Sequence, residues 1–310
     1  MRVFVAGASG AIGRALLPRL LAAGHEVTGM TRRQDRADEI RAAGGAAVVC
    51  DVYDAAALRD VVVAAKPEAV VHALTALPTK FNPKKDYLAP TNRIRVEGTR
   101  NLIAAAQAAG ARRLVAESIA FAYEPRGDWV KDEEAPLFER APGNYGAAFG
   151  AIADLERQVT SADGLEGVVL RYGWLYGPGT HYDRGGQQAE EVMKRRLPIV
   201  GKGTGTFSFI HAEDAATATA AALERGAAGI YNVVDDEPAP LREWVPVYAE
   251  TLGAKPPRRV PVWLARLVAG AATAEAALQL RGAGNAKAKR ELGWKPAHPS
   301  WRQGFRDLLA

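Results

Sequence analysis

A glycine-rich turn between a strand and a helix constrains this chain more than any other feature. The apolar run Val3–Ala6 leads directly into Gly7-Ala8-Ser9-Gly10-Ala11-Ile12-Gly13, and a helical pattern follows until Gly24. Glycines in this position permit a tight turn and let the backbone approach a pyrophosphate, while the start of the helix offers free N–H groups to the anion. The turn therefore predicts a dinucleotide-binding domain at this end of the chain.

The end of the second strand indicates which dinucleotide is bound. It reads Met30-Thr31-Arg32-Arg33 and lacks the acidic residue that binds the ribose 2′-hydroxyl in NAD sites. Two guanidiniums can hold a 2′-phosphate, so this pattern favours NADP over NAD. The alternative interpretation is that Arg32 and Arg33 are solvated surface charges. Asp51 can accept from the adenine amino group or can be a turn residue. The complete set expected at the cofactor is Gly7, Ser9, Gly10, Ala11, Ile12, Gly13, Arg32, Arg33, Asp51, Val52, Ala73 and Leu74.

Alternating strand and helix patterns predict an α/β fold, a Rossmann-type doubly wound parallel sheet. The expected strands are Val3–Ala6, His25–Met30, Ala46–Cys50, Ala69–His72, Arg113–Glu117, Gly167–Tyr172 and Ile230–Val234. The clearest helices are Arg14–Ala23, Asn92–Ala109, Gly146–Thr160 and Ala212–Arg225. After Tyr172 the strand–helix alternation stops, and we expect a smaller, discontinuous C-terminal substrate domain. Residues 1–173 and 207–236 are expected to form the dinucleotide domain, and residues 174–206 and 237–310 the substrate domain. The loop Gly173–Gly186 is expected at the substrate entrance.

Composition excludes several classes of protein. The single cysteine, Cys50, rules out an intrachain disulfide framework, and the net charge of +5 is dispersed, which argues against nucleic-acid binding. The apolar stretch Val260–Leu280 contains charges and is expected to be a packed helix, not a membrane span. No metal site is expected, because the histidines show no ligand spacing; they are His25, His72, His181, His211 and His298. We expect a cytoplasmic protein whose partner is a small-molecule substrate.

These motifs resemble the extended short-chain dehydrogenase/reductase superfamily, in its epimerase/dehydratase branch. The matching segments are Gly7-x-x-Gly10-x-x-Gly13, Val71-His72-Ala73, Val96-Glu97-Gly98-Thr99, Tyr176-Gly177-Pro178-Gly179, Phe209-Ile210-His211-Ala212-Glu213-Asp214 and Leu292-Gly293-Trp294. The resemblance covers nearly the whole chain and implies a Rossmann domain with a C-terminal domain that encloses the substrate. It also implies a possible homodimer through the helices Asn92–Ala109 and Gly146–Thr160.

The sequence departs from this superfamily at the catalytic residues. The resemblance implies a Ser or Thr after the fifth strand and a Tyr-x-x-x-Lys pair on the next helix, but the usual hydroxyl position holds Ile119, one residue after Ser118. If Tyr145 is the tyrosine, the lysine position is Phe149; an alignment through Glu156 instead gives Ala148 and Ile152. Neither alignment supplies a lysine.

The missing lysine limits the chemistry that can be expected. An unassisted tyrosine has a pKa of about 10 and is ionised only about once in a thousand at pH 7, but the neutral phenol can still protonate a carbonyl that receives hydride. We therefore expect an NADP-dependent oxidoreductase that reduces a carbonyl of a small organic or sugar-nucleotide-like compound, with Tyr145 and Ser118 as the catalytic residues. The alternatives are a non-catalytic NADP-binding redox sensor and a nucleotide-sugar epimerase or dehydratase.

Overall fold

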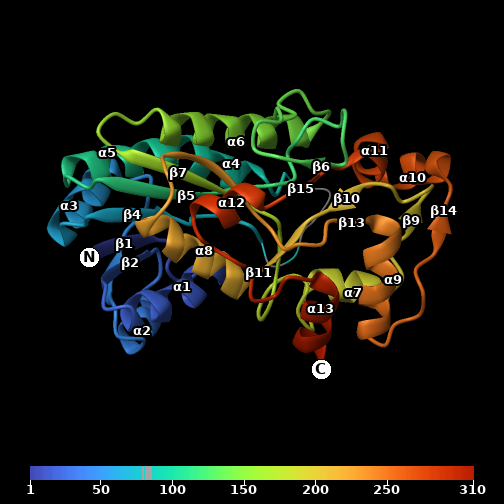
Figure 1. Ribbon diagram of the computed structural model, residues 1–310, viewed down its shortest axis with the longest axis horizontal. Helices are drawn as coiled ribbons and strands as arrows, with labels where there is room; N and C mark the ends of the chain where they lie inside the picture. Colours follow the sequence, from blue (N-terminus) through green and yellow to red (C-terminus); the bar gives the residue numbers. More distant parts are fainter. Residues whose placement is uncertain (79, 81–85) are drawn as a thin grey trace.

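A parallel sheet forms the centre of the computed structural model, which describes residues 1–78, 80 and 86–310 (Figure 1). Its seven strands lie in the order β3-β2-β1-β4-β5-β7-β12. The order runs outward in two directions from β1, which confirms the doubly wound Rossmann topology and places the switch point between β1 and β4. The strands are β1 (Arg2–Ala6), β2 (Glu26–Thr31), β3 (Ala46–Val49), β4 (Ala69–His72), β5 (Arg113–Ile119), β7 (Glu166–Tyr172) and β12 (Gly229–Val233).

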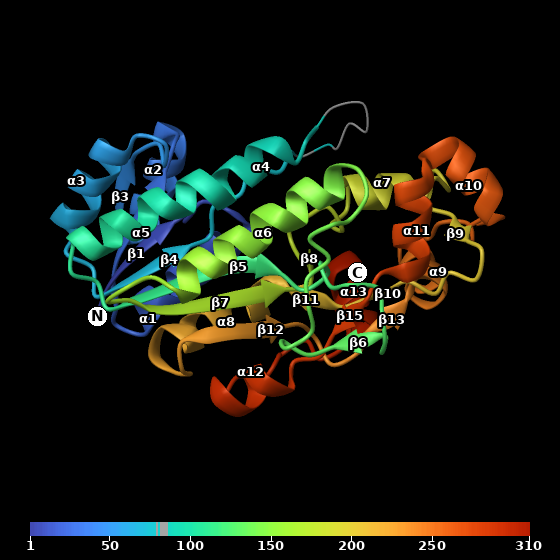
Figure 2. The same cartoon turned by 90° about the horizontal axis from the view of Figure 1, so that it is seen from above.

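Helices cover both faces of this sheet, which explains why its strands are apolar without interruption. Along β1, Val3 and Val5 face one hydrophobic core, whereas Phe4 and Ala6 face the other. Figure 2 shows α1 (Ala11–Ala22) and α8 (Ala212–Glu224) on one side and α5 (Thr99–Ala108) and α6 (Asn144–Thr160) on the opposite side. Two further helices, α2 (Gln34–Ala42) and α3 (Ala55–Ala65), connect β2 to β3 and β3 to β4.

The helix expected over Asn92–Ala109 begins earlier and is irregular. It starts as α4 (Ala89–Arg93), widens into a π-helical turn over Ile94–Gly98 and continues as α5. Such π turns inside helices occur frequently at functional sites. Here the turn buries the side chain of Arg95 at the C-terminal edge of the sheet.

A second core lies beyond the C-terminal edge of the sheet and is mainly aromatic. Tyr176, Tyr182, Trp244 and Phe305 are all buried in it, together with Phe209. The short strand pairs β8–β11 and β6–β15 connect this region to the first domain. The elements of this region are β6 (Val130–Lys131), β8 (Trp174–Tyr176), α7 (Gln187–Met193), β9 (Ile199–Val200), β10 (Thr206–Phe207), β11 (Phe209–His211), β13 (Ala239–Pro240), α9 (Leu241–Thr251), β14 (Arg259–Val260), α10 (Val262–Ala269), α11 (Ala271–Gln279), β15 (Gly282–Ala283) and α13 (Trp301–Leu309). Helix α12 (Ala286–Glu291) instead packs against β12 of the sheet.

The expectation of a single packed helix over Val260–Leu280 was wrong. Gly270 adopts a φ of 87° and separates α10 from α11, which fold against each other as a helical hairpin. Only one face of α10 packs, and Trp263 and Leu267 on its other face are 67% and 78% exposed. Within the described ranges, no helix combines the length and the apolar character that crossing a membrane requires.

Candidate active site

The glycine turn has the shape of a phosphate cradle. Gly7 has a φ of 96°, and a Cβ atom there would lie 2.1 Å from the carbonyl oxygen of Ala73 on the neighbouring strand. A Cβ atom on Gly13 would lie 2.3 Å from the carbonyl oxygen of Gly7. Helix α1 follows Gly10 without a side-chain cap, so its first N–H groups remain available to an anion. The residues of this turn therefore fit the pyrophosphate of a dinucleotide.

The two arginines after β2 differ in their surroundings. The Arg33 side chain donates through Nε to Asp35 at 2.9 Å, which occupies it in an exposed ion pair. Arg32 is exposed, and no ion pair ties it to another described residue. Ser9 donates to Thr31 at 3.3 Å and so connects the glycine turn to the end of β2. Arg32 is therefore the better placed of the two guanidiniums to receive a 2′-phosphate.

The remaining residues expected at the cofactor follow β3 and β4 at the same edge of the sheet. Asp51 is exposed, and its carboxylate accepts from the backbone N–H of Tyr53 at 3.0 Å, as a turn residue would. Val52 is buried, and its carbonyl oxygen accepts from Asn101. The N–H of Ala73 donates to Ala6, and the N–H of Leu74 donates to His72. The sheet thus brings this set together, but its contacts with a cofactor remain a prediction.

A cavity of about 650 Å³ adjoins this edge and is lined mainly by apolar side chains. Residues that directly follow β5 and β7 form part of its wall, and Phe121 and Trp174 stack there with ring centroids 4.1 Å apart. Of the described residues that line it, Arg196 and Glu275 are the only ones that carry a formal charge at neutral pH. Its aromatic residues are Phe121, Tyr123, Phe138, Tyr145, Phe149, Trp174 and Phe207. The cavity therefore offers mainly apolar surface and aromatic ring faces to a ligand.

The start of α6 supplies the cavity wall where the superfamily has its tyrosine and lysine. Tyr145 and Phe149 line the cavity, with ring centroids 6.0 Å apart, while Ala148 and Ile152 are buried behind them. Burial raises the pKa of Tyr145, so the phenol stays protonated at neutral pH. Both alignments of this helix thus place an uncharged residue at the lysine position.

Ser118 lies in a buried cluster on the α6 side of the sheet, not among the residues that line the cavity. Its hydroxyl donates to Glu156 at 2.7 Å, and Arg171 binds the same carboxylate with Nε at 2.8 Å and Nη2 at 2.6 Å. Arg171 also donates to the hydroxyl of Tyr123 at 3.0 Å, which in turn donates to Asn232. This placement does not support direct contact between Ser118 and a substrate, so its catalytic role stays a prediction.

The cluster also contains Glu156, the residue on which the second alignment of α6 depends. Glu156 is fixed by the bidentate pair with Arg171, the last residue but one of β7. An alignment through Glu156 therefore rests on a buried ion pair, and it gives Ala148 and Ile152 at the positions of the tyrosine and the lysine. Tyr145 lies one helical turn nearer the start of α6.

A second pair of charges lies at the end of β5. Burial raises the pKa of the Glu117 carboxyl to about 7, an effect that the nearby Arg95 guanidinium partly offsets. Burial and the same arginine lower the pKa of His72 to about 4, so this histidine is neutral and bonded to Thr99 at 3.0 Å. The charged and titratable groups at this end of β5 thus comprise one buried guanidinium, one carboxyl group with a raised pKa and one neutral imidazole.

Sequence reasoning missed most of the cavity wall. Phe138, Phe207 and Leu264 come from separate segments, and no local spacing connects them. The loop expected at the substrate entrance, Gly173–Gly186, contributes only Trp174 to the wall, because Tyr176 and Tyr182 turn into the aromatic core instead.

Comparison with known proteins identifies relatives over the whole chain. The sequence model described as the NAD dependent epimerase/dehydratase family matches residues 3–234. A 3-diazoavenalumate denitrifying reductase from a Streptomyces species is 50% identical over 98% of this chain and 99% of its own length. A 2-alkyl-3-oxoalkanoate reductase from Stenotrophomonas maltophilia is 28% identical over 82% of this chain and 76% of its own length.

Solved structures share the fold over the full length. The UDP-glucose 4-epimerase of Thermotoga maritima superposes with a TM-score of 0.77 at 19% identity, covering 100% of this chain and 97% of that one. The dTDP-glucose 4,6-dehydratase of Streptomyces venezuelae, solved with NAD, superposes with a TM-score of 0.77 at 22% identity over 100% and 96% of the two chains. At these identities the likeness establishes the fold alone.

Proposed function

We propose a reaction for this chain, which belongs to the NAD-dependent epimerase/dehydratase family and is an oxidoreductase of the short-chain dehydrogenase/reductase type. The proposed reaction is the reduction of an aromatic diazo compound with NADPH, which releases dinitrogen. The observation that carries this proposal is the apolar wall at the start of α6. The lysine position holds Phe149 if Tyr145 is the tyrosine, and it holds Ile152 if the tyrosine position is Ala148, so neither alignment supplies a charged proton-transfer partner. The substrate class is that in the name of the relative with 50% identity.

The reduction of a diazonium group needs no proton from the protein. When bound, the reduced nicotinamide supplies a hydride to the substrate. For an aryl diazonium, Ar–N₂⁺ plus H⁻ gives Ar–H plus N₂: a C–H bond forms, the C–N bond breaks, and its electron pair leaves with the dinitrogen. A ketone, by contrast, becomes an alkoxide that must be protonated. A site without a lysine-activated tyrosine therefore matches the diazonium better than the ketone.

The cavity wall can also protect such a substrate. A diazonium carbon is attacked by water, and an apolar wall reduces the access of water to it. The stacked rings of Phe121 and Trp174, together with Phe207, offer π faces to a cationic aryl group. In the proposed reaction the protein binds the substrate, orients it and limits its contact with water, and it does not transfer a proton.

The preference for NADPH is tested by replacing Arg32. We expect Arg32→Ala to weaken NADPH binding about 10- to 100-fold, because charge-assisted hydrogen bonds to the 2′-phosphate, each worth about 1.5–3 kcal/mol, are lost. Binding of NADH should not change. Arg33→Ala is the matched control and should have a smaller effect, since Asp35 already occupies that guanidinium. Titrations followed by nicotinamide fluorescence measure all three constants; equal affinity of Arg32→Ala and the parent for NADPH would contradict the assignment.

The proposed reaction is tested by Tyr145→Phe, first with the diazo compound and then with an aryl ketone that is described below. With 3-diazoavenalumate we expect the variant to keep kcat within about twofold, because no step requires its phenol proton. Deuterium from C4-labelled NADPH should appear at the carbon that carried nitrogen, as mass spectrometry can show. Reactions without protein correct for direct reduction by NADPH. Failure of the parent protein to consume NADPH with this compound, or an unlabelled product, would refute the proposal.

Carbonyl reduction is the second candidate, and one observation favours it. Tyr145 lines the cavity with a protonated phenol, which is the form that a proton donor to an alkoxide requires. An aryl ketone of similar size distinguishes the two reactions. Turnover of the ketone that falls by about 100-fold in Tyr145→Phe, without turnover of the diazo compound, would establish this second function instead.

A further inference from the structure

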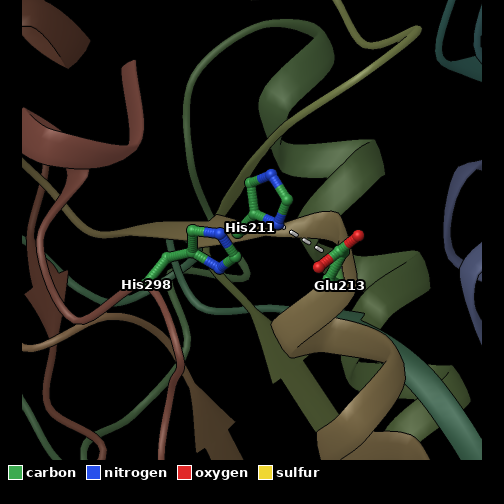
Figure 3. Close-up of side chains that lie close together, drawn as sticks. All are labelled: His211, Glu213 and His298. Atoms are coloured by element: carbon green, nitrogen blue, oxygen red, sulfur yellow. Dashed lines mark hydrogen bonds between the residues drawn. The ribbon is translucent and has the colours of Figure 1, made fainter. Parts of the chain in front are cut away.

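Two histidines and a glutamate, two of them near one another in sequence and the third far along the chain, lie close together (Figure 3). His211 ends β11, Glu213 lies in the first turn of α8, and His298 belongs to the segment before α13. One ligand atom from each residue lies within 4.8 Å of the others. None of the three lines the large cavity, so this group is separate from the proposed substrate site.

The hydrogen-bond partners define which nitrogen of each ring carries the proton and which carries the lone pair. Nδ1 of His211 accepts from the backbone N–H of Glu213 at 3.2 Å, so its lone pair is engaged at the start of α8 and Nε2 carries the proton. Nδ1 of His298 lies 3.1 Å from a carboxylate oxygen of Asp214 and acts as the donor, which leaves the lone pair on Nε2. His298 thus has a free lone pair on Nε2, whereas His211 can bind a cation through Nδ1 only by giving up the hydrogen bond from the Glu213 N–H.

Asp214 supplies a supporting shell of the kind found behind metal-bound histidines. It is 1% exposed, and its carboxylate also accepts from the backbone N–H groups of Ala297 and His298, at 2.7 Å and 2.8 Å. A carboxylate that holds the far nitrogen of a histidine fixes its tautomer and orients the ring toward a metal. Here the same carboxylate also holds the backbone of the segment that carries the ring.

We propose that His211, Glu213 and His298 bind a divalent transition-metal ion, with zinc as the best match. Two imidazoles and one carboxylate are a preferred zinc donor set, and water completes the tetrahedron. The ion connects strand β11 and helix α8 to the segment that precedes α13. Its role is structural, since it fastens the end of the chain to the first domain.

Binding requires small rearrangements of the three side chains. Ligand atoms on a tetrahedral zinc with bonds of about 2.0–2.2 Å are about 3.4 Å apart, so the present separations must shorten. The rings of His211 and His298 are stacked, with centroids 3.9 Å apart and planes 28° from each other, and they must tilt further to direct both lone pairs at one ion. Glu213 must also leave Arg19, whose Nη2 lies 3.5 Å away in an exposed ion pair.

Calorimetry of chelator-treated protein with zinc chloride tests the site. We expect one ion per chain with a dissociation constant in the micromolar range or below, and a rise in Tm of several degrees at saturating zinc. Glu213→Gln and His298→Ala should each weaken binding at least about tenfold. His25→Ala is the matched control: its ring contacts Glu224 at the other end of α8, and its loss should leave zinc affinity unchanged.

Two readouts keep the test decisive. Glu213 is 53% exposed at its side chain, so Glu213→Gln retains the fold even if His298→Ala loses stability. Absence of saturable zinc binding, or equal affinity of Glu213→Gln and the parent, would overturn the proposal. Neither result depends on turnover of any substrate, so the metal site and the proposed function succeed or fail separately.

Discussion

Arg171→Met should destabilise the protein by about 3–5 kcal/mol, because it leaves the Glu156 carboxylate buried without its cation. The two side chains are 4% and 5% exposed and share two hydrogen bonds, at 2.8 Å and 2.6 Å. Methionine approximates the volume of the arginine stem, so the loss reports on the charge and not on a cavity. A fall in Tm of about 6–20 °C in thermal unfolding would agree with this estimate.

Helix α6, which carries Glu156, also carries an exposed ion pair that serves as a matched control for Arg171→Met. Arg157 pairs with Asp154 at 2.7 Å, but its side chain is 63% exposed, so Arg157→Ala should change the free energy of unfolding by less than about 1 kcal/mol. The double variant Arg171→Met with Glu156→Leu should recover much of the lost stability, because no uncompensated charge then remains. If Arg171→Met proves no more harmful than Arg157→Ala, the cluster does not stabilise the junction of β5, β7 and α6.

Gly13→Ala should reduce dinucleotide affinity at least about 100-fold, equivalent to about 2.7 kcal/mol. Alanine normally stabilises a helix by up to about 1 kcal/mol relative to glycine, so a loss at this position must come from steric conflict. The added methyl group would lie 2.3 Å from the carbonyl oxygen of Gly7 and 2.6 Å from that of Ala8. These backbone atoms can move only by deforming the turn that cradles the phosphates. Fluorescence titration with NADPH measures the effect.

Gly150→Ala provides the comparison for this helix position. Gly150 lies within α6, and a Cβ atom there meets no other atom within 4 Å. We expect this variant to bind the dinucleotide normally and to gain as much as about 1 kcal/mol of stability. Normal dinucleotide affinity in Gly13→Ala would show that the turn adapts and is not the pyrophosphate site.

Local sequence was sufficient for the dinucleotide domain. The glycines of the turn, the arginines after β2 and the strand ends at Asp51 and Ala73 are each close in sequence to an apolar run that defines a strand. Since the carboxyl ends of parallel strands meet at one edge, the strand assignment alone places these residues together. The structure adds that Arg33 is held by Asp35, a contact between close neighbours that the sequence analysis had not considered.

The catalytic assignment could not be made from sequence, because it depends on a helix register. Spacing alone left Tyr145 and Ala148 as equal candidates for one position. The structure adds that a bidentate contact between Glu156 and Arg171 joins α6 to β7 and that Ser118 lies in the same buried cluster, whereas Tyr145 lines the cavity. Such a contact between separate elements leaves no periodic signal along the chain.

The sequence by itself determined the doubly wound sheet, the glycine turn and the absence of a lysine at the expected position, because each is a matter of local chemistry or of residue identity. Only the tertiary structure decided what surrounds that position. It assembled an aromatic cavity from segments as distant as Phe121 and Leu264, and it brought His298 against His211. Packing between elements placed these residues together. Because this packing depends on the whole fold, local sequence patterns do not predict it.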